Sequence, residues 1–305
     1  MTARLSFVLS VLSLLWISSV GFAEDEQLQK YKDIWAATRP KVESGIIHYK
    51  QYSGANLLLH EHDKVRDLLK QMKDRDDYSA IVREVACALN NAKVPDNAPE
   101  YPEQVLYFKE DKLRIERYEG IEIFNDGLFI KARHVKVNDR SMQININDKN
   151  GRVLPMMEHF WDFYPVPSAE VTDTMSVVTG QTDTDRIECS QNRTYLLGAS
   201  LIVAKNGDIL EIISGETKRT SSERLFFAFK EFDGVRLTQL VFKGTYVDGG
   251  LTSATVSAIV DAQFNVTIDD NLFVQDAKGG DVIVDERVGK GRSQMLKNDV
   301  ADVTQ

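Results

Sequence analysis

The sequence predicts a mainly β (α+β) protein: a curled antiparallel sheet or half-open barrel with helices packed on it, plus an inserted helical hairpin. From Glu103 onward, apolar segments alternate with dipeptides that tolerate positive φ in tight hairpins. These dipeptides are Asp126-Gly127, Asn150-Gly151, Asn206-Gly207, Asp233-Gly234 and Asp248-Gly249. A run of hairpins makes a meandering antiparallel sheet, which at 305 residues must curl or close. Before Glu103, apolar residues recur at helical spacing instead.

The first 23 residues are expected to be a cleaved export signal. Arg4 precedes an apolar run from Leu5 to Val20, and the small residues Gly21 and Ala23 lie at positions -3 and -1 of a cut after Ala23. The run is shorter than the roughly 20 residues of a spanning helix. We therefore expect a mature chain that begins at Glu24 and is not inserted stably in a membrane. An uncleaved anchor is the alternative.

The mature chain is expected to begin with an amphipathic helix. Leu28, Tyr31 and Trp35 share one face of it, and Pro40 ends it. A strand should follow from Ile46 to Tyr52.

Residues 60–91 are interpreted as a helical insertion. Two apolar stripes at helical spacing are separated by the charged segment Lys73 to Asp77, which predicts an αα-hairpin from Asp63 to Asn91. The stripes are Val65, Leu68, Leu69 and Met72, then Tyr78, Ile81, Val82, Val85 and Leu89. Such stripes must be buried, most simply on the sheet that follows.

The β region has several clear strand segments. Leu113 and Ile115 alternate with Arg114 and Glu116. Further β-rich runs are Leu196 to Ala204, Ile209 to Ser214, Leu225 to Phe229, Leu237 to Phe242 and Thr255 to Val260. We expect a single domain over residues 24–288 and a disordered polar tail over residues 289–305.

Two cysteines, Cys87 and Cys189, allow one disulfide in an exported chain. Cys87 lies half a turn from the stripe of its helix, so its thiol is either exposed or turned toward another part of the fold. The pairing of the two cysteines and two free thiols are both open.

Charge and motifs exclude several classes of function. Lys+Arg 37 against Asp+Glu 46 gives a net charge of -9, which disfavours nucleic-acid binding. The sequence has no nucleophile elbow, phosphate-binding loop or dinucleotide fingerprint. His60 and His62 have no third ligand spaced to join them, so a solvated helix start is preferred to a metal site. We expect no enzymatic activity, no cofactor and no metal.

The end of the chain resembles the periplasmic lipoprotein-carrier superfamily, the LolA/LolB-like fold that also includes the N-terminal domain of RseB-type sensors. Asn265, Ile268, Asp270 and Phe273 are similar to its N-x-x-I-x-D-x-x-F strand. Gly279 or Gly280 with Val282, Val284, Asp285 and Arg287 is similar to its final G-x-x-V-x-D-x-R. Leu106 to Lys109, Leu113 and the segment Phe124 to Gly127 are similar to its L-W-V-K-R-P strand and the following hairpin.

Two departures separate this chain from the carriers. Glu110-Asp111 stands where the family has Arg-Pro after the Lys, and that arginine is associated with the lid over the lipid cavity. The carrier lid mechanism is therefore not transferred. The insertion at 60–91 also makes the chain longer than a minimal carrier, so a bacterial branch of the superfamily fits better than a true carrier.

Aromatic and aliphatic side chains are the candidate ligand contacts. Phe160, Trp161, Phe163 and Tyr164 crowd together before Pro165, either as core or as the lining of a cavity in the curled sheet. Leu113 and Ile115 should point inward. Arg117 continues their parity and would meet an anionic head group, or lie at the exposed end of its strand.

These observations predict a non-enzymatic, exported, periplasmic or extracellular binding module for an apolar ligand. A lipid or an acylated protein is the expected partner. The alternative is a protein-interaction or envelope-sensor module of the RseB type, without a lipid ligand.

Overall fold

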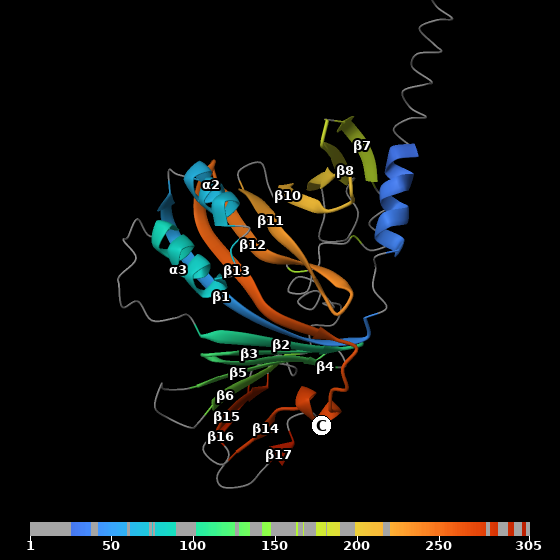
Figure 1. The fold of residues 1–305 in the computed structure, drawn as a ribbon. Coiled ribbons are helices and arrows are strands. Elements are labelled where there is room, and N and C mark those ends of the chain that lie inside the picture. The colour runs from blue at the N-terminus through green and yellow to red at the C-terminus, as the bar shows by residue number, and fades with distance from the viewer. Residues whose placement is uncertain are drawn as a thin grey trace, which may run out of the picture. The chain divides into compact units, whose positions relative to one another are not determined.

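The computed structural model confirms the predicted fold class, since it is mostly strands in one large, curled, unclosed sheet with few helices (Figure 1). The residues it describes are 26–37, 42–59, 62–72, 75, 77–89, 102–125, 128–134, 142–147, 163, 167, 175–180, 182–189, 199–215, 220–278, 281–285, 292–295 and 301–302. The predicted signal and its cleavage site at Ala23 and Glu24 lie outside these residues.

Fifteen strands form the main sheet, in the order β16-β15-β6-β5-β4-β3-β2-β1-β13-β12-β11-β10-β9-β8-β7. The first half of the chain supplies β1 (Ser44–Leu59), β2 (Glu103–Lys109), β3 (Lys112–Arg117), β4 (Gly120–Asn125), β5 (Leu128–His134) and β6 (Met142–Asn147). The second half supplies β7 (Met175–Gly180), β8 (Thr184–Cys189), β9 (Ala199–Ala204), β10 (Ile209–Gly215), β11 (Thr220–Phe232), β12 (Val235–Val247), β13 (Gly250–Phe264), β15 (Val282–Asp285) and β16 (Arg292–Met295). Neighbours pair antiparallel through most of the sheet, whereas β15 pairs parallel with β6.

Three of the five predicted turn dipeptides lie in the described residues, and each connects two consecutive strands. Asp233-Gly234 and Asp248-Gly249 have positive φ at both residues, as a tight hairpin turn with the twist of its strands requires. Asn206-Gly207 lies between β9 and β10. Asp126-Gly127 and Asn150-Gly151 are outside the described residues.

The chain falls into two compact units. One unit contains residues 1–40, 165–226 and 243–252, and the other contains residues 41–164, 227–242 and 253–305. Strands β11, β12 and β13 therefore contribute residues to both units. The single-domain boundaries 24–288 stay a prediction.

The predicted helical hairpin is present as α2 (His62–Met72) and α3 (Tyr78–Leu89). Asp77 begins α3 by accepting a hydrogen bond at Oδ1 from the Ala80 amide, 3.1 Å away, which satisfies a free amide of the first turn. Helix α3 packs on α2 and on β1. The described stripe residues face inward, with Leu68 half-buried and the others fully buried. These others are Leu69, Met72, Ile81, Val82 and Val85.

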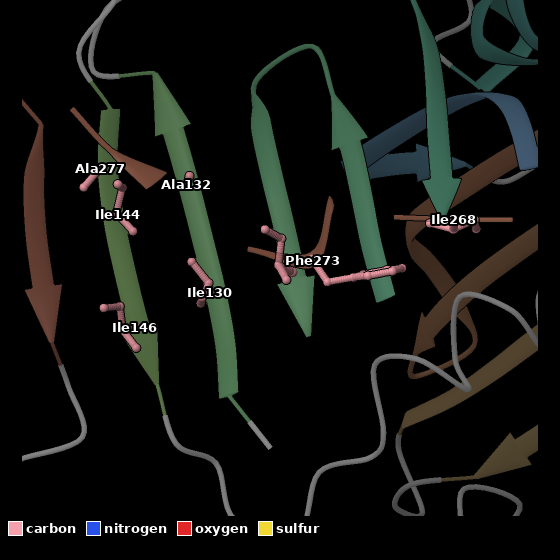
Figure 2. Packing of buried hydrophobic residues seen from close by; sticks show 8 residues of the cluster. Ile130, Ala132, Ile144, Ile146, Ile268, Phe273 and Ala277 are labelled. Carbon is pink, nitrogen blue, oxygen red and sulfur yellow. The ribbon is translucent and has the colours of Figure 1, made fainter. Parts of the chain in front are cut away.

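A cluster of branched side chains forms the core between β4, β5, β6 and the C-terminal segment (Figure 2). It contains Ile123, Ile130, Ala132, Ile144, Ile146, Ile268, Phe273 and Ala277. The two motif residues Ile268 and Phe273 are thus core residues, which explains why the closing motif needs apolar side chains at these positions. Phe273 ends the short helix η1 (Asp270–Phe273).

Polar contacts hold the same C-terminal segment on the sheet. Lys112 and Lys109 place Nζ 2.9 and 3.2 Å from Asp270 Oδ1, and Arg114 Nη1 donates to the Leu272 carbonyl at 2.8 Å. Hydrogen bonds from Lys112 and Lys109 lower the pKa of Asp270. Asn265 Oδ1 accepts from the Glu43 amide at 3.1 Å. These contacts bind residues 265–273 to one face of the sheet, and we call this segment the C-terminal clasp.

The predicted disordered tail over 289–305 contains two short paired segments among the described residues, and its disorder elsewhere stays a prediction. Arg292–Met295 is β16, paired with β15, and Ala301–Asp302 is β17, paired with β14 (Asp276–Ala277). The tail has no apolar periodicity, but strand pairing uses main-chain groups and can extend a sheet edge without such a pattern.

The predicted N-terminal helix spans residues 26–37, and Leu28, Tyr31 and Trp35 are all buried, as expected from their shared face. Trp35 Nε1 donates to the Gly207 carbonyl at 2.8 Å. Tyr31 donates through its hydroxyl to Asp185 Oδ2 at 2.5 Å. The rings of Tyr31 and Trp35 stack with their centroids 5.8 Å apart. The helix is therefore anchored to β8 and to the turn between β9 and β10.

Both cysteines are free thiols, Cys87 half-buried and Cys189 buried. Burial, followed by the neighbouring Glu188 carboxylate, raises the pKa of Cys189 to about 12.

Candidate ligand-binding face

Leu113 and Ile115, predicted to point inward, lie on one face of the sheet and are buried. Leu106, Phe108 and Phe124 are buried on the same face, because Leu106 pairs with Ile115 and Leu113 pairs with both Phe108 and Phe124. We call the surface formed by Leu106, Phe108, Leu113, Ile115 and Phe124 the apolar face. It lies opposite the C-terminal clasp, since Lys112 and Arg114 alternate with these residues along β3.

An aromatic pair lies beside the apolar face. Tyr49 of β1 and Phe163 are both buried, with ring centroids 5.1 Å apart and planes tilted by 58°. Tyr49 pairs in register with Gln104, two residues before Leu106. Of the four predicted aromatic residues, Phe163 is the one described. Phe160, Trp161 and Tyr164 lie outside the described residues and stay predictions.

The apolar face ends in charged side chains. Arg117 continues the parity of Leu113 and Ile115, as predicted, and its Nη1 lies 3.0 Å from Glu122 Oε1. Lys131 forms an ion pair with the same carboxylate oxygen. The side chain of Arg117 is 28% exposed and therefore partly buried, and both predicted roles, head-group contact and strand end, stay predictions.

Glu122 and Lys131 were not singled out in the sequence, although a signal for them was present. A two-residue turn at Asp126-Gly127 places residues equally distant from the turn opposite each other, and Glu122 and Lys131 are each four positions away. In the observed register, Leu106 lies opposite Ile115, Ile115 opposite Glu122, and Glu122 opposite Lys131. The apolar pair and the ion pair therefore belong to one row across the sheet. A predicted hairpin therefore contained a predictable cross-strand ion pair.

A small pocket of about 30 Å³ lies at this charged end. Its lining comes from β3, β4, β5 and the turn between β3 and β4, and consists of Arg117, Glu119, Gly120, Ile121, Glu122, Lys131, Ala132 and Arg133. Gly120 has φ +153°, and a Cβ there would lie 2.0 Å from the Ala132 carbonyl oxygen. The close approach of β4 to β5 that forms the pocket wall therefore requires glycine.

Two buried polar atoms at this end of the face have no hydrogen-bond partner within the described part of the chain. They are Arg117 Nε and Gln104 Oε1. The antiparallel register that pairs Val105 with Glu116 brings Gln104 opposite Arg117 one step further along. Both side chains lie on the apolar face, because they are two residues from Leu106 and Ile115.

The described ranges hold no group of three or more His, Cys, Asp or Glu side chains that could bind a metal ion. In the same ranges, no helix combines the length and the apolar character needed to cross a membrane.

The fold was compared with solved structures. A DUF1329 family protein from Desulfovibrio piger matches at TM-score 0.41 and 10% identity, covering 83% of this chain and 96% of that one. A LolA superfamily protein from Nitrosomonas europaea matches at TM-score 0.36 and 10% identity, covering 81% of this chain and 97% of that one. A domain described as an outer membrane lipoprotein-sorting protein, from Vibrio parahaemolyticus, matches at 0.37 and 10% identity, covering 81% and 94%.

No protein-family model and no curated protein matches the sequence.

Proposed function

We propose that the protein is a non-enzymatic, exported binding module whose ligand is apolar, either a lipid or the acyl chains of a lipoprotein. The ligand would lie along the apolar face, beside the Tyr49–Phe163 pair. The observation that carries the proposal is the segregation of side chains on β3, where Leu113 and Ile115 share a face that turns cationic at Arg117. An amphiphile has the same order of apolar and polar parts.

The energetics of such binding require no ion pair along the chain of the ligand. Transfer of an acyl chain from water gains roughly 0.8 kcal/mol per buried CH₂, so a long chain binds through its length alone. This agrees with the Glu110-Asp111 departure, which removes the carrier arginine associated with a lid. The predicted export signal and the resemblance to periplasmic carriers support a location outside the cytoplasm.

Fluorescence titration tests the proposal. In a Trp35→Phe variant of the mature chain, Trp161 is the remaining tryptophan and lies two residues from Phe163. Titration with fatty acids or lipopeptides should give a saturable shift of its emission. Absence of a response to every lipid would overturn the proposal and leave the interaction or sensor module as the better account.

A matched pair of variants locates the binding surface. Ile115 and Ile123 are both 1% exposed but lie on opposite faces of the sheet, the first on the apolar face and the second in the core cluster with the clasp. In the Trp35→Phe background, Ile115→Ala should weaken lipid binding severalfold, because it removes about three buried carbon atoms of contact. Ile123→Ala should lower stability and leave the affinity unchanged. Equal effects on affinity would contradict the assigned face.

A further inference from the structure

The charged end of the apolar face contains hydrogen-bonding capacity that the described residues do not use. Arg117 Nε and Gln104 Oε1 are buried and unpartnered, whereas Arg117 Nη1 is engaged with Glu122. A buried donor or acceptor without a partner destabilises the folded state. Two such atoms at facing positions of β2 and β3 are hydrogen-bonding groups that a further polar group would satisfy.

The pocket carries the charge that an anion would need. Arg117, Lys131 and Arg133 line it together with Glu119 and Glu122, so three cationic side chains stand against two anionic ones. The whole chain has a net charge of -9, so this locally positive pocket is not a general property of its surface. Glu122 accepts from both Arg117 and Lys131, which holds the two cations in place without exhausting the donors of the guanidinium.

Gln104 can be turned to match an anion. A half-turn about its last side-chain bond exchanges the positions of the amide oxygen Oε1 and the amide nitrogen Nε2. Oε1 has no partner in the described part of the chain, and rotation of the amide would put Nε2 in its place as a second donor opposite Arg117. Two N–H donors, one of them charged, suit an oxyanion.

The size of the pocket limits the anion. A water-sized group needs about 10 to 15 Å³ of such space, so a pocket of about 30 Å³ accepts about two oxygen atoms. We propose that Gln104, Arg117 and the adjoining pocket bind the oxyanion head group of an amphiphile, with a carboxylate as the fitting size, while its chain follows the apolar face. This inference rests on the proposed function and narrows its ligand to anionic amphiphiles.

Calorimetric titration of the full mature chain with four C12 probes tests the head-group site. The probes are dodecanoate, dodecyl phosphate, dodecanol and dodecyltrimethylammonium, which share one apolar chain and differ in the head. At pH 8 we expect dodecanoate to bind at least about tenfold more tightly than dodecanol, since a hydrogen bond to a charged group is worth that factor or more. Dodecyltrimethylammonium should bind most weakly.

Variants connect this preference to Arg117. Arg117→Met keeps an apolar stem and should remove the tenfold advantage of dodecanoate over dodecanol. Arg117→Lys keeps the charge without the Nε donor and should retain part of the advantage. Arg186→Met is the charge-matched control, because Arg186 pairs with Glu188 at 2.8 Å on β8 and does not line the pocket. It should leave all four affinities unchanged.

The possible results separate the two proposals. Tighter binding of dodecyl phosphate than of dodecanoate, lost in Arg117→Met, supports an oxyanion site that takes phosphate. Equal binding of dodecanoate and dodecanol in both wild type and Arg117→Met overturns the head-group site but leaves the apolar-ligand module intact. If no probe binds, the proposed function fails and the head-group site fails with it. Unfolding midpoints show that each variant is folded.

Discussion

The anchor of the N-terminal helix and the charged end of the apolar face both bury ionisable side chains, but they differ in how these are satisfied. At the anchor, Asp185 is 2% exposed and accepts hydrogen bonds from Gln27, Tyr31 and Lys205, at 3.1, 2.5 and 2.6 Å. At the apolar face, Arg117 Nε and Gln104 Oε1 have no partner in the described residues. The anchor is complete, whereas the face is not.

The difference distinguishes a structural polar cluster from one suited to binding. A complete buried network fixes one arrangement, so its members contribute to stability. An incomplete one lowers stability and is retained where an external group completes it. Substitutions should therefore be costly at the anchor and cheap at the pocket, although the pocket contains more charges.

Asp185→Ala should have the largest effect. The substitution leaves the fully buried Tyr31 hydroxyl without its acceptor and Lys205 without its partner, and breaking a buried pair in this way costs about 3 to 5 kcal/mol. The partial exposure of Lys205 favours the lower end of that range. Urea unfolding should show a clearly lower midpoint. Asp183→Ala, two residues away and exposed, is the control and should leave the midpoint nearly unchanged.

Alkaline pH should weaken the anchor next most strongly. Burial, together with the hydrogen bond to Asp185, raises the pKa of Tyr31 from 10.0 to about 12. Because the folded-state pKa is the higher one, this contribution is present below pH 10 and is lost as the pH rises toward about 12. The rise corresponds to roughly 3 kcal/mol.

The Tyr31→Phe variant isolates this effect. Wild type should be the more stable protein at pH 8, and the difference in unfolding free energy should shrink between pH 10 and pH 12. Cys189, with its pKa also near 12, lowers the stability of both proteins in the same range, so the difference reports Tyr31. A difference that stays constant with pH would contradict the assignment.

Acidic pH should also weaken the anchor, through Asp185 itself. Desolvation alone would raise the pKa of this carboxyl, but hydrogen bonds from Lys205 and Tyr31 outweigh it and hold the pKa below its ordinary value. Its contribution is therefore present above about pH 4 and is lost as the pH falls through the folded-state pKa.

Gly120→Ala should cost about 1 to 3 kcal/mol, because the added Cβ would overlap the Ala132 carbonyl oxygen at 2.0 Å and β4 must move from β5. Among the substitutions proposed at the pocket, Gly120→Ala is therefore the one expected to lower the free energy of unfolding clearly. Gly249→Ala is the control, since that glycine also has positive φ but no atom within 4 Å of an added Cβ. Thermal unfolding of both variants should show the greater loss for Gly120→Ala. Equal losses would indicate that φ alone decides.

The contrast between anchor and pocket was only partly visible in the sequence. The burial of Leu28, Tyr31 and Trp35 followed from helical spacing, and the inward direction of Leu113 and Ile115 followed from strand alternation. Both are local periodicities, which one segment of sequence contains completely. The recognised ending, with Ile268, Asp270 and Phe273, was also available because its residues lie close together in the chain.

The hydrogen-bond partners of the buried polar groups could not be predicted from the sequence in this way. Asp185 meets Tyr31 across 154 positions of sequence, and Gln104 faces Arg117 through a register that depends on the β2–β3 turn at Glu110, which has positive φ without being glycine. The residue pattern of one segment does not tell which distant group will form a hydrogen bond with its polar side chains. The tail strands were missed for a related reason, because their pairing follows from an open main-chain edge rather than from side-chain spacing.

Arg117→Met should have the smallest effect on stability, and this is the sharpest test of the comparison. The substitution loses the ion pair with Glu122, but a partly exposed pair is worth about 0 to 1 kcal/mol and Lys131 still neutralises that carboxylate. It also removes the unpartnered Nε, which relieves a cost of similar size. The free energy of unfolding, measured without ligand, should therefore change by less than about 1 kcal/mol. A loss of about 3 kcal/mol or more would show that Arg117 is a structural group like Asp185, with its donors satisfied inside the chain, and the pocket would then have no unused capacity to offer a ligand.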